Sequence, residues 1–218
     1  MNVKLFVLGR PGSGKSTAAS YIKRQFALRG YTTHHINDYT ILQAMFHADV
    51  EHKQFRPTAN NGFDAIDLSV MDTALHEVEK NAEEWLPFTN LVTIEFARDN
   101  YHHALRQFHP DFLRDAHILF MDADIETCLR RVHQRVEHAA STDDHPSFSD
   151  DIFRRYYGPD NRAYMSYYVQ QAFKMRKLVQ VIDNRCSLEE CIQQVDQFAH
   201  AVFEYEMSFS ISPPALAG

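Results

Sequence analysis

Short apolar segments alternate along the chain with longer stretches in which apolar residues recur at helical spacing. Five of the short segments are rich in β-branched or aromatic residues and predict strands, at residues 3–8, 31–36, 91–94, 117–121 and 178–182. Helices are predicted between them, at residues 15–29, 40–47, 64–85, 125–138, 152–175 and 188–207, the fifth interrupted near Gly158 and Pro159. This alternation favours an α/β fold in which a five-stranded parallel sheet is covered by helices on both faces.

Two polar segments interrupt the alternation. Residues 48–63 are irregular in pattern, and residues 139–151 are rich in Ser, Asp and Pro. Loops that follow parallel strands border the ligand crevice, so both segments are expected to be mobile parts of the binding site. The first is expected to belong to an acceptor-binding insertion at 38–85, and the second to a lid at 136–155. Plain surface insertions are the alternative reading. Residues 1–207 are expected to form one domain, and residues 208–218, with Ser, Pro, Ala and Gly, a flexible tail.

Composition narrows the classes of function. With 218 residues and 44% hydrophobic content the chain can bury a substantial single core. A formal net charge of -7 argues against a general nucleic-acid surface, although a local basic groove stays open. The three cysteines form no CxxC pair, which favours buried thiols in a reducing compartment over a disulfide framework.

Neither a targeting segment nor a metal cluster stands out. The first residues lead at once into a Gly-rich turn, with no apolar signal core, and no apolar stretch approaches the roughly 20 residues of a membrane span. A cytoplasmic location without membrane contact is therefore expected. The 13 histidines are scattered, and the adjacent pairs His34-His35 and His102-His103 lack same-face helical spacing, so core or solvated roles are expected for them.

One motif carries specific chemistry. Residues 9–17 read GRPGSGKST and match G-x-x-x-x-G-K-[ST], between a predicted strand and a predicted helix. Glycines allow successive backbone N–H groups to face phosphate oxygens, the lysine adds charge at the β- and γ-phosphates, and the following hydroxyl can bind Mg²⁺. The predicted nucleotide-binding residues of this loop are Gly9, Pro11, Gly12, Ser13, Gly14, Lys15, Ser16 and Thr17. The motif predicts the P-loop NTPase fold with a bound nucleoside triphosphate and Mg²⁺.

A phosphoryl-transfer site also needs an acidic residue across the metal, at the end of a strand beside the first one. Glu95 and Asp122 are the two candidates, and Glu95 is preferred because Arg98 follows it closely. Ser16 and Glu95 are thus the predicted metal ligands, and Arg98 is predicted to hold the acceptor or the transferring phosphoryl group. A surface arginine at a helix start is the alternative for Arg98.

These residues together resemble the nucleoside monophosphate kinase group, with adenylate kinase as the nearest comparison. The P-loop resembles that family's P-loop in its Pro-Gly-Ser-Gly core, and residues 93–98 resemble the strand-end acid that is followed by an arginine. Residues 121–135 are similar to the strand and helix that enter the family's lid, and residues 150–157 to the segment that leaves it. The resemblance implies that Arg131 and Arg135 contact the nucleotide and that Asn184 lies in the adenine-side loop. It also implies that the segment with Arg154 and Arg155 supplies arginine to the substrate.

The arginines have a physical role that does not depend on the resemblance. Phosphoryl transfer spreads negative charge over the equatorial oxygens, which guanidinium groups on a closing lid stabilise while water is excluded. Arg131, Arg135, Arg154 and Arg155 are placed in sequence to do so. One or two of them are expected to be solvated helix charges instead.

The chain departs from that family after the second strand. Where the family places an arginine that grips the acceptor's phosphate, the sequence runs from Asn37 and Asp38 with no arginine until Arg56, which is kept as a substrate-binding candidate. An acid at this position resembles another branch of P-loop kinases, in which a carboxylate takes the proton of an attacking hydroxyl. Asp38 is therefore predicted to be either that general base or the N-cap of the next helix.

The leading function is that of an ATP-dependent phosphotransferase that acts on a small nucleotide, nucleoside or other hydroxyl or phosphate acceptor, with GTP not excluded as the donor. Two alternatives stay open, a polynucleotide 5′-hydroxyl kinase and a P-loop ATPase or switch without an acceptor. The absence of a guanine-reading N/T-K-x-D motif argues against a GTPase switch.

Overall fold

A parallel sheet forms the centre of the computed structural model, which describes residues 1–58, 62–137 and 149–210. Its strands are β1 (Val3–Leu8), β2 (Thr33–Asn37), β5 (Leu91–Phe96), β6 (Ala116–Asp122) and β7 (Val179–Asp183), in the order β2-β5-β1-β6-β7. Every pairing in this sheet is parallel. The five predicted strands and the α/β class are confirmed.

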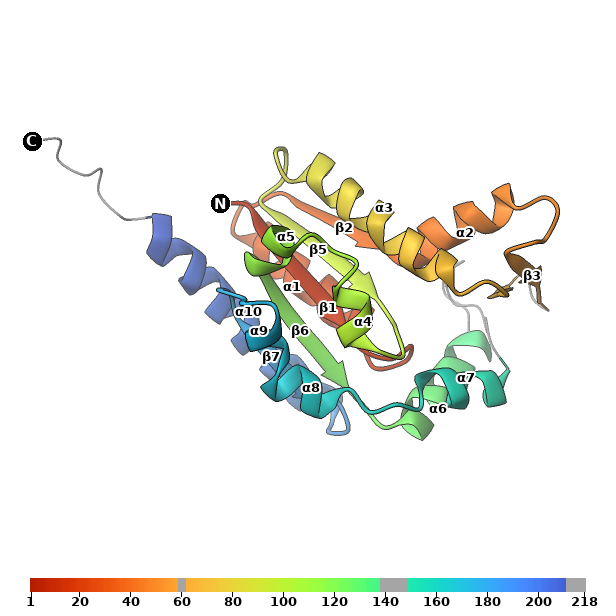
Figure 1. Cartoon of the computed structure of the whole chain (residues 1–218). Coiled ribbons are helices and arrows are strands. Elements are labelled where there is room, and N and C mark those ends of the chain that lie inside the picture. Colours follow the sequence, from red (N-terminus) through yellow and green to blue (C-terminus); the bar gives the residue numbers. More distant parts are fainter. Residues whose placement is uncertain (59–61, 138–148, 211–218) are drawn as a thin grey trace, which may run out of the picture.

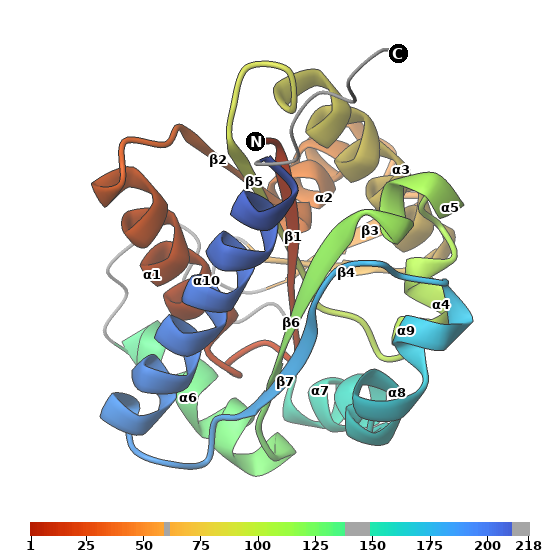
Figure 2. The ribbon, with the colours of Figure 1, turned by 90° about the vertical axis from the view of Figure 1, so that its left-hand side faces the viewer.

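Helices cover both faces of the sheet, as Figure 2 shows. Side chains of β1 alternate between the two faces, with Phe6 and Leu8 in one core and Val3, Leu5 and Val7 in the other. On the second face lie α1 (Lys15–Leu28) and α10 (Leu188–Ser210), which pack against each other. The first face is covered by α3 (Ser69–Trp85), α4 (Tyr101–Leu105), α5 (Pro110–Arg114), α8 (Arg162–Tyr167) and α9 (Val169–Ala172).

The remaining elements gather at the carboxyl ends of the strands (Figure 1). They are α2 (Asp38–Ala48), the antiparallel pair β3 (Phe55–Pro57) and β4 (Phe63–Ala65), α6 (Ile125–Glu137) and α7 (Asp150–Tyr157). A small core of Leu42, Phe55 and Phe63 joins α2 and the hairpin to α3, and Cys128 and Phe153 belong to a second one between α6 and α7. Two separately packed bodies therefore border the end of the sheet where the P-loop lies.

Several element boundaries differ from the predictions. The helix expected at 64–85 begins at Ser69, because residues 63–65 pair with residues 55–57 instead. Residues 48–63 are thus not irregular throughout, and the ring of Phe55 is fully buried. The interruption expected near Gly158 and Pro159 is confirmed, because α7 ends at Tyr157 and α8 begins at Arg162, and Pro159 lacks the N–H that a continuous helix needs. A second break, at Tyr168 between α8 and α9, was not predicted. Helices α4 and α5 are too short to leave a periodic pattern and were not predicted.

The predicted insertion, lid and tail each lie partly beyond the described residues, and in the insertion at 38–85 these are residues 59–61. Of the predicted lid at 136–155, residues 138–148 are outside the described ranges, and α7 begins at Asp150. The last helix continues to Ser210, past the predicted start of the tail at residue 208, and residues 211–218 are outside the described ranges. Within the ranges that are described, the helices are too short or too polar to cross a bilayer.

Candidate active site

The P-loop connects β1 to α1 and has a backbone that only glycine adopts easily. Gly12 and Gly14 have φ values of 81° and 97°, and a Cβ at Gly12 would overlap the Cys128 carbonyl oxygen. At Gly14 a Cβ would overlap the Asn184 side chain, whose amide donates to the Ser13 carbonyl at 2.8 Å. The loop is therefore held between the start of α6 and the turn after β7.

Lys15 lies at the first position of α1 with its ammonium folded back toward the loop. Its Nζ donates to the Arg10 carbonyl at 3.0 Å and lies 4.0 Å from Glu95 Oε1. Burial lowers the pKa of Lys15, and the carboxylates of Glu95 and Asp38 oppose this effect. The ammonium is thus a buried cation beside the Glu95 carboxylate, in the place where the motif predicts phosphate.

Two side chains that the sequence did not single out hold the loop in position. The buried Tyr101 hydroxyl accepts the Gly9 N–H at 2.8 Å and donates to the Gly9 carbonyl at 3.0 Å, and the Arg98 N–H lies 3.4 Å away. Burial raises the pKa of Tyr101, so its hydroxyl stays protonated and can donate. Arg10 donates to the carbonyls of Ala123 and Tyr157, at 3.0 and 2.7 Å. Neither contact has a sequence signature, because both partners are far apart along the chain.

Ser16 and Glu95 meet as the two predicted metal ligands. Ser16 Oγ donates to Glu95 Oε1 at 2.7 Å, and Glu95 Oε2 is buried with no hydrogen-bond partner among the described residues. The rival acid Asp122 accepts from Arg162 at 2.8 Å and does not line the cavity. A hydroxyl, a free carboxylate oxygen and nucleotide phosphates suit Mg²⁺, which keeps few protein ligands. Among the described residues no three His, Cys, Asp or Glu side chains form a metal site by themselves.

Asp38 and Arg98 form a buried ion pair on the other side of the cavity. Arg98 Nη1 donates to Asp38 Oδ2, and Nη2 donates to the Met71 carbonyl at 2.9 Å. Asn37 is the N-cap of α2, because its side chain accepts the Tyr39 N–H at 3.0 Å. The capping alternative for Asp38 is therefore wrong. Burial raises the pKa of the Asp38 carboxyl, against the opposing effect of Arg98.

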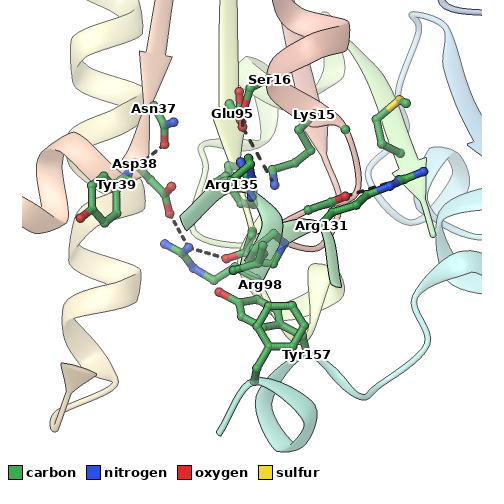
Figure 3. Close-up of a pocket in the computed structure, with 18 of the residues that line it drawn as sticks. Lys15, Ser16, Asn37, Asp38, Tyr39, Glu95, Arg98, Arg131, Arg135 and Tyr157 are labelled. Atoms are coloured by element: carbon green, nitrogen blue, oxygen red, sulfur yellow. Dashed lines mark hydrogen bonds and ion pairs between the residues drawn. The ribbon is translucent and has the colours of Figure 1, made fainter. Parts of the chain in front are cut away.

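A single cavity of about 1210 Å³ joins these groups, and Figure 3 shows most of them around it. Most of the predicted site residues line it: Pro11, Gly12, Gly14, Lys15, Ser16, Thr17, Asp38, Arg56, Glu95, Arg98, Arg131, Arg135, Arg155 and Asn184. Gly9 and Ser13 are in the loop wall behind it. The end beside Asn184 continues along α10 past Leu188 and Ile192, and the opposite end reaches Phe63 in the hairpin.

The predicted arginines take different positions. Arg131 donates to the Asn184 carbonyl at 3.1 Å, above the P-loop, while Arg135 and Arg155 are exposed at the cavity rim. Arg154 instead makes two hydrogen bonds of 2.9 Å to the Glu126 carboxylate on the outer surface, and it does not line the cavity. Arg154 is thus directed away from the cavity, because the helical turn of α7 separates its direction from that of its neighbour Arg155, and its assignment to the substrate stays a prediction.

Arg56 is on the hairpin rim of the cavity, two-thirds exposed and 3.1 Å from Asp64. The histidine side chains were expected to be core or solvated, but His35 lines the cavity beside Glu95. The period-two alternation of β2 would have placed His35 on the same face as Asn37, next to the strand end.

Comparison with known proteins places the fold. No protein-family model and no curated protein sequence matches the chain. Among solved structures, the APS kinase of Mycobacterium tuberculosis in complex with AMPPNP and APS is similar at a TM-score of 0.54 and 17% identity, over 91% of this chain and 98% of that one. A gluconokinase from Sinorhizobium meliloti 1021 is similar at a TM-score of 0.53 and 15% identity, over 97% and 98%.

The chain therefore has an α/β fold similar to the folds of these two kinases, built on its five-stranded parallel sheet. Identities this low show the fold alone. Neither structure is an adenylate kinase, so the resemblance to that family stays a prediction.

Proposed function

We propose that the protein is an ATP-dependent phosphotransferase that moves the γ-phosphate of the nucleotide to a hydroxyl group of a small acceptor. The observation that carries this proposal is the shared cavity, in which the P-loop and Lys15 face the buried pair of Asp38 and Arg98. An ATPase without an acceptor has no need of a buried ion pair such as Asp38 and Arg98 across the cavity from the phosphate loop. The structural similarity to two kinases of small molecules, one with AMPPNP bound, supports ATP as the donor.

Asp38 is the general base in this proposal. Its carboxylate accepts the proton of the acceptor hydroxyl while that oxygen forms its bond to the γ-phosphorus and the bond to the leaving ADP breaks. A pKa raised by burial brings the carboxyl closer to the pH at which a base is most effective. Arg98, held in place by Asp38 and the Met71 carbonyl, fixes the carboxylate and faces the transferring group.

The positive groups of the cavity serve the donor side. Lys15 is within reach of the β- and γ-phosphates once its contact with the Arg10 carbonyl is exchanged for phosphate oxygen. Arg131 lies over the P-loop, and Arg135 and Arg155 at the rim can approach when the nucleotide binds. Mg²⁺ bound to Ser16 and Glu95 would neutralise phosphate charge.

The acceptor end is lined by the ion pair of Arg56 and Asp64 and by several apolar groups. Phe63, Leu42 and Met71 form an apolar wall, and Arg56 is the exposed cation on that side. This composition fits a compact molecule that carries a hydroxyl group and an apolar face. It suits a polynucleotide end less well, because the phosphate backbone needs a longer basic track.

The test is a screen for transfer of the γ-phosphate of labelled ATP to nucleosides, sugars, nucleoside monophosphates, aminoglycosides and 5′-hydroxyl oligonucleotides. Labelled product from a small hydroxyl acceptor is the expected result, and the Lys15→Ala variant should abolish it while unfolding as cooperatively as the parent. Transfer to the oligonucleotide alone would support the polynucleotide alternative. Release of labelled phosphate at one rate with every acceptor would leave the ATPase reading and overturn this proposal.

A further inference from the structure

The adjacent histidines of β2 face opposite sides of the sheet. His34 stacks on the Trp85 ring of α3, with ring centroids 3.9 Å apart and planes 14° from parallel. His35 lines the cavity on the α1 side, as Asn37 does two residues further on. The strand register pairs His35 with Thr93 and Asn37 with Glu95, so the imidazole and the Glu95 carboxylate belong to the same face of neighbouring strands.

The His35 ring is fixed from behind by a threonine. His35 Nδ1 lies 2.9 Å from Thr93 Oγ1, and that hydroxyl lies 3.3 Å from the His34 carbonyl oxygen, to which it donates. With the hydroxyl hydrogen used in this way, Nδ1 is the donor and Nε2 carries the free lone pair. A metal-binding histidine is held in the same manner, by a hydrogen bond from its second nitrogen to a polar group behind it.

Nε2 and the Glu95 carboxylate then face each other as two acceptors. Nε2 lies 3.6 Å from Glu95 Oε2, too far for a hydrogen bond, and this Oε2 is the buried oxygen without a partner among the described residues. Two atoms bound to one six-coordinate ion at about 2.1 Å lie between about 3.0 and 4.2 Å apart, for neighbouring and opposite positions. The separation observed is within that range.

We infer that His35 Nε2 is a ligand of the divalent cation at this site, beside Glu95 and Ser16. The inference rests on the proposed function for the nucleotide phosphates that complete the coordination. An imidazole nitrogen suits Mn²⁺, Co²⁺ and Zn²⁺ better than Mg²⁺, which prefers oxygen. The site is therefore expected to favour a transition-metal ion over Mg²⁺ more strongly than an all-oxygen site would.

The direct test is the electron spin-echo signal of Mn²⁺ bound to the full-length protein with the nucleotide analogue AMPPCP, which has no nitrogen in its phosphate chain. Nitrogen modulation from a directly bound imidazole is expected in the parent protein and in the His34→Asn control, and it should be lost in His35→Asn. The same substitution should weaken Mn²⁺ binding by about 10-fold or more, as is typical when the surroundings of a metal are altered, and Mg²⁺ binding by less. Bound Mn²⁺ without nitrogen modulation in the parent protein would overturn the inference.

This experiment needs no acceptor, so it separates the inference from the proposed function. Nitrogen modulation in a protein that transfers phosphate to no acceptor would support His35 as a metal ligand and overturn the proposed kinase activity. Normal phosphate transfer without nitrogen modulation would support the kinase activity and overturn the assignment of His35. Failure of the parent protein to bind Mn²⁺ with AMPPCP, while Glu95→Gln behaves identically, would overturn both.

Discussion

Asp38→Asn removes the charge of the proposed base while it keeps the size of the side chain and a hydrogen-bond acceptor for Arg98. General-base catalysis contributes about 10²–10⁴ in rate, or about 2.7–5.4 kcal/mol of barrier. We expect kcat to fall by at least about 10², with little change in KM for ATP, because Asp38 is across the cavity from the P-loop.

The same substitution also bears on stability. The Arg98 side chain is only 4% exposed, so it would become a buried cation without its counter-ion, at a cost of about 3–5 kcal/mol in the free energy of unfolding. A second variant, Asp38→Asn with Arg98→Met, removes both charges and should recover most of that stability without recovering activity. Activity that follows stability across the two variants would mean that Asp38 acts only as a structural partner.

The assay is steady-state transfer to the acceptor identified by the screen, measured across pH together with urea denaturation. In the parent protein kcat/KM should rise with pH through the raised pKa of Asp38, since the base acts when ionised, and this acidic limb should disappear in Asp38→Asn. Asp64→Asn is the matched control, because Asp64 lines the same cavity but pairs with the exposed Arg56. A folded Asp38→Asn protein with near-normal kcat would refute the base assignment.

Two further predictions concern the loop and the far end of the sheet. Gly12→Ala should weaken nucleotide binding and destabilise the fold by about 1–3 kcal/mol, since a Cβ would overlap the Cys128 carbonyl. Gly30 has a similar φ of 83° but lies in open space, so Gly30→Ala should leave nucleotide binding unchanged in a calorimetric titration. His117 is buried beside Glu206 and Lys177, and burial lowers its pKa below the ordinary 6.5. The contribution of neutral His117 to the free energy of unfolding is thus complete above pH 6.5 and is lost as the pH falls through the lowered pKa. Urea denaturation of His117→Gln should therefore show a smaller loss of unfolding free energy between pH 7 and 5 than the parent protein shows. The same loss in both proteins would contradict this.

The fold could be predicted from the sequence because the patterns that indicate it lie within short stretches of the chain. The apolar strand before GRPGSGKST and the amphipathic helix after it lie within 28 residues, and the strand-end position of Glu95 follows from the same pattern. Three features of the site could not be predicted from the sequence, each for a physical reason. Which of Asn37 and Asp38 caps α2 depends on which side chain turns back to the backbone. The contacts of Tyr101 and His35 join segments that are distant in sequence. The direction of Arg154, away from the cavity that Arg155 lines, was not predictable either, because adjacent residues on a short helix point in different directions.

The Tyr101 hydroxyl has a consequence for the order in which the molecule assembles. It lies 92 positions from Gly9 in the sequence, and the N–H that it satisfies belongs to the first residue of the phosphate loop. Closing a contact of such long separation costs loop entropy that a local contact does not cost. The loop therefore reaches its final shape only after β5 and α4 are in place. Nucleotide binding should accordingly require α4 to be in place, and a nascent chain that ends before residue 101 should not yet bind nucleotide.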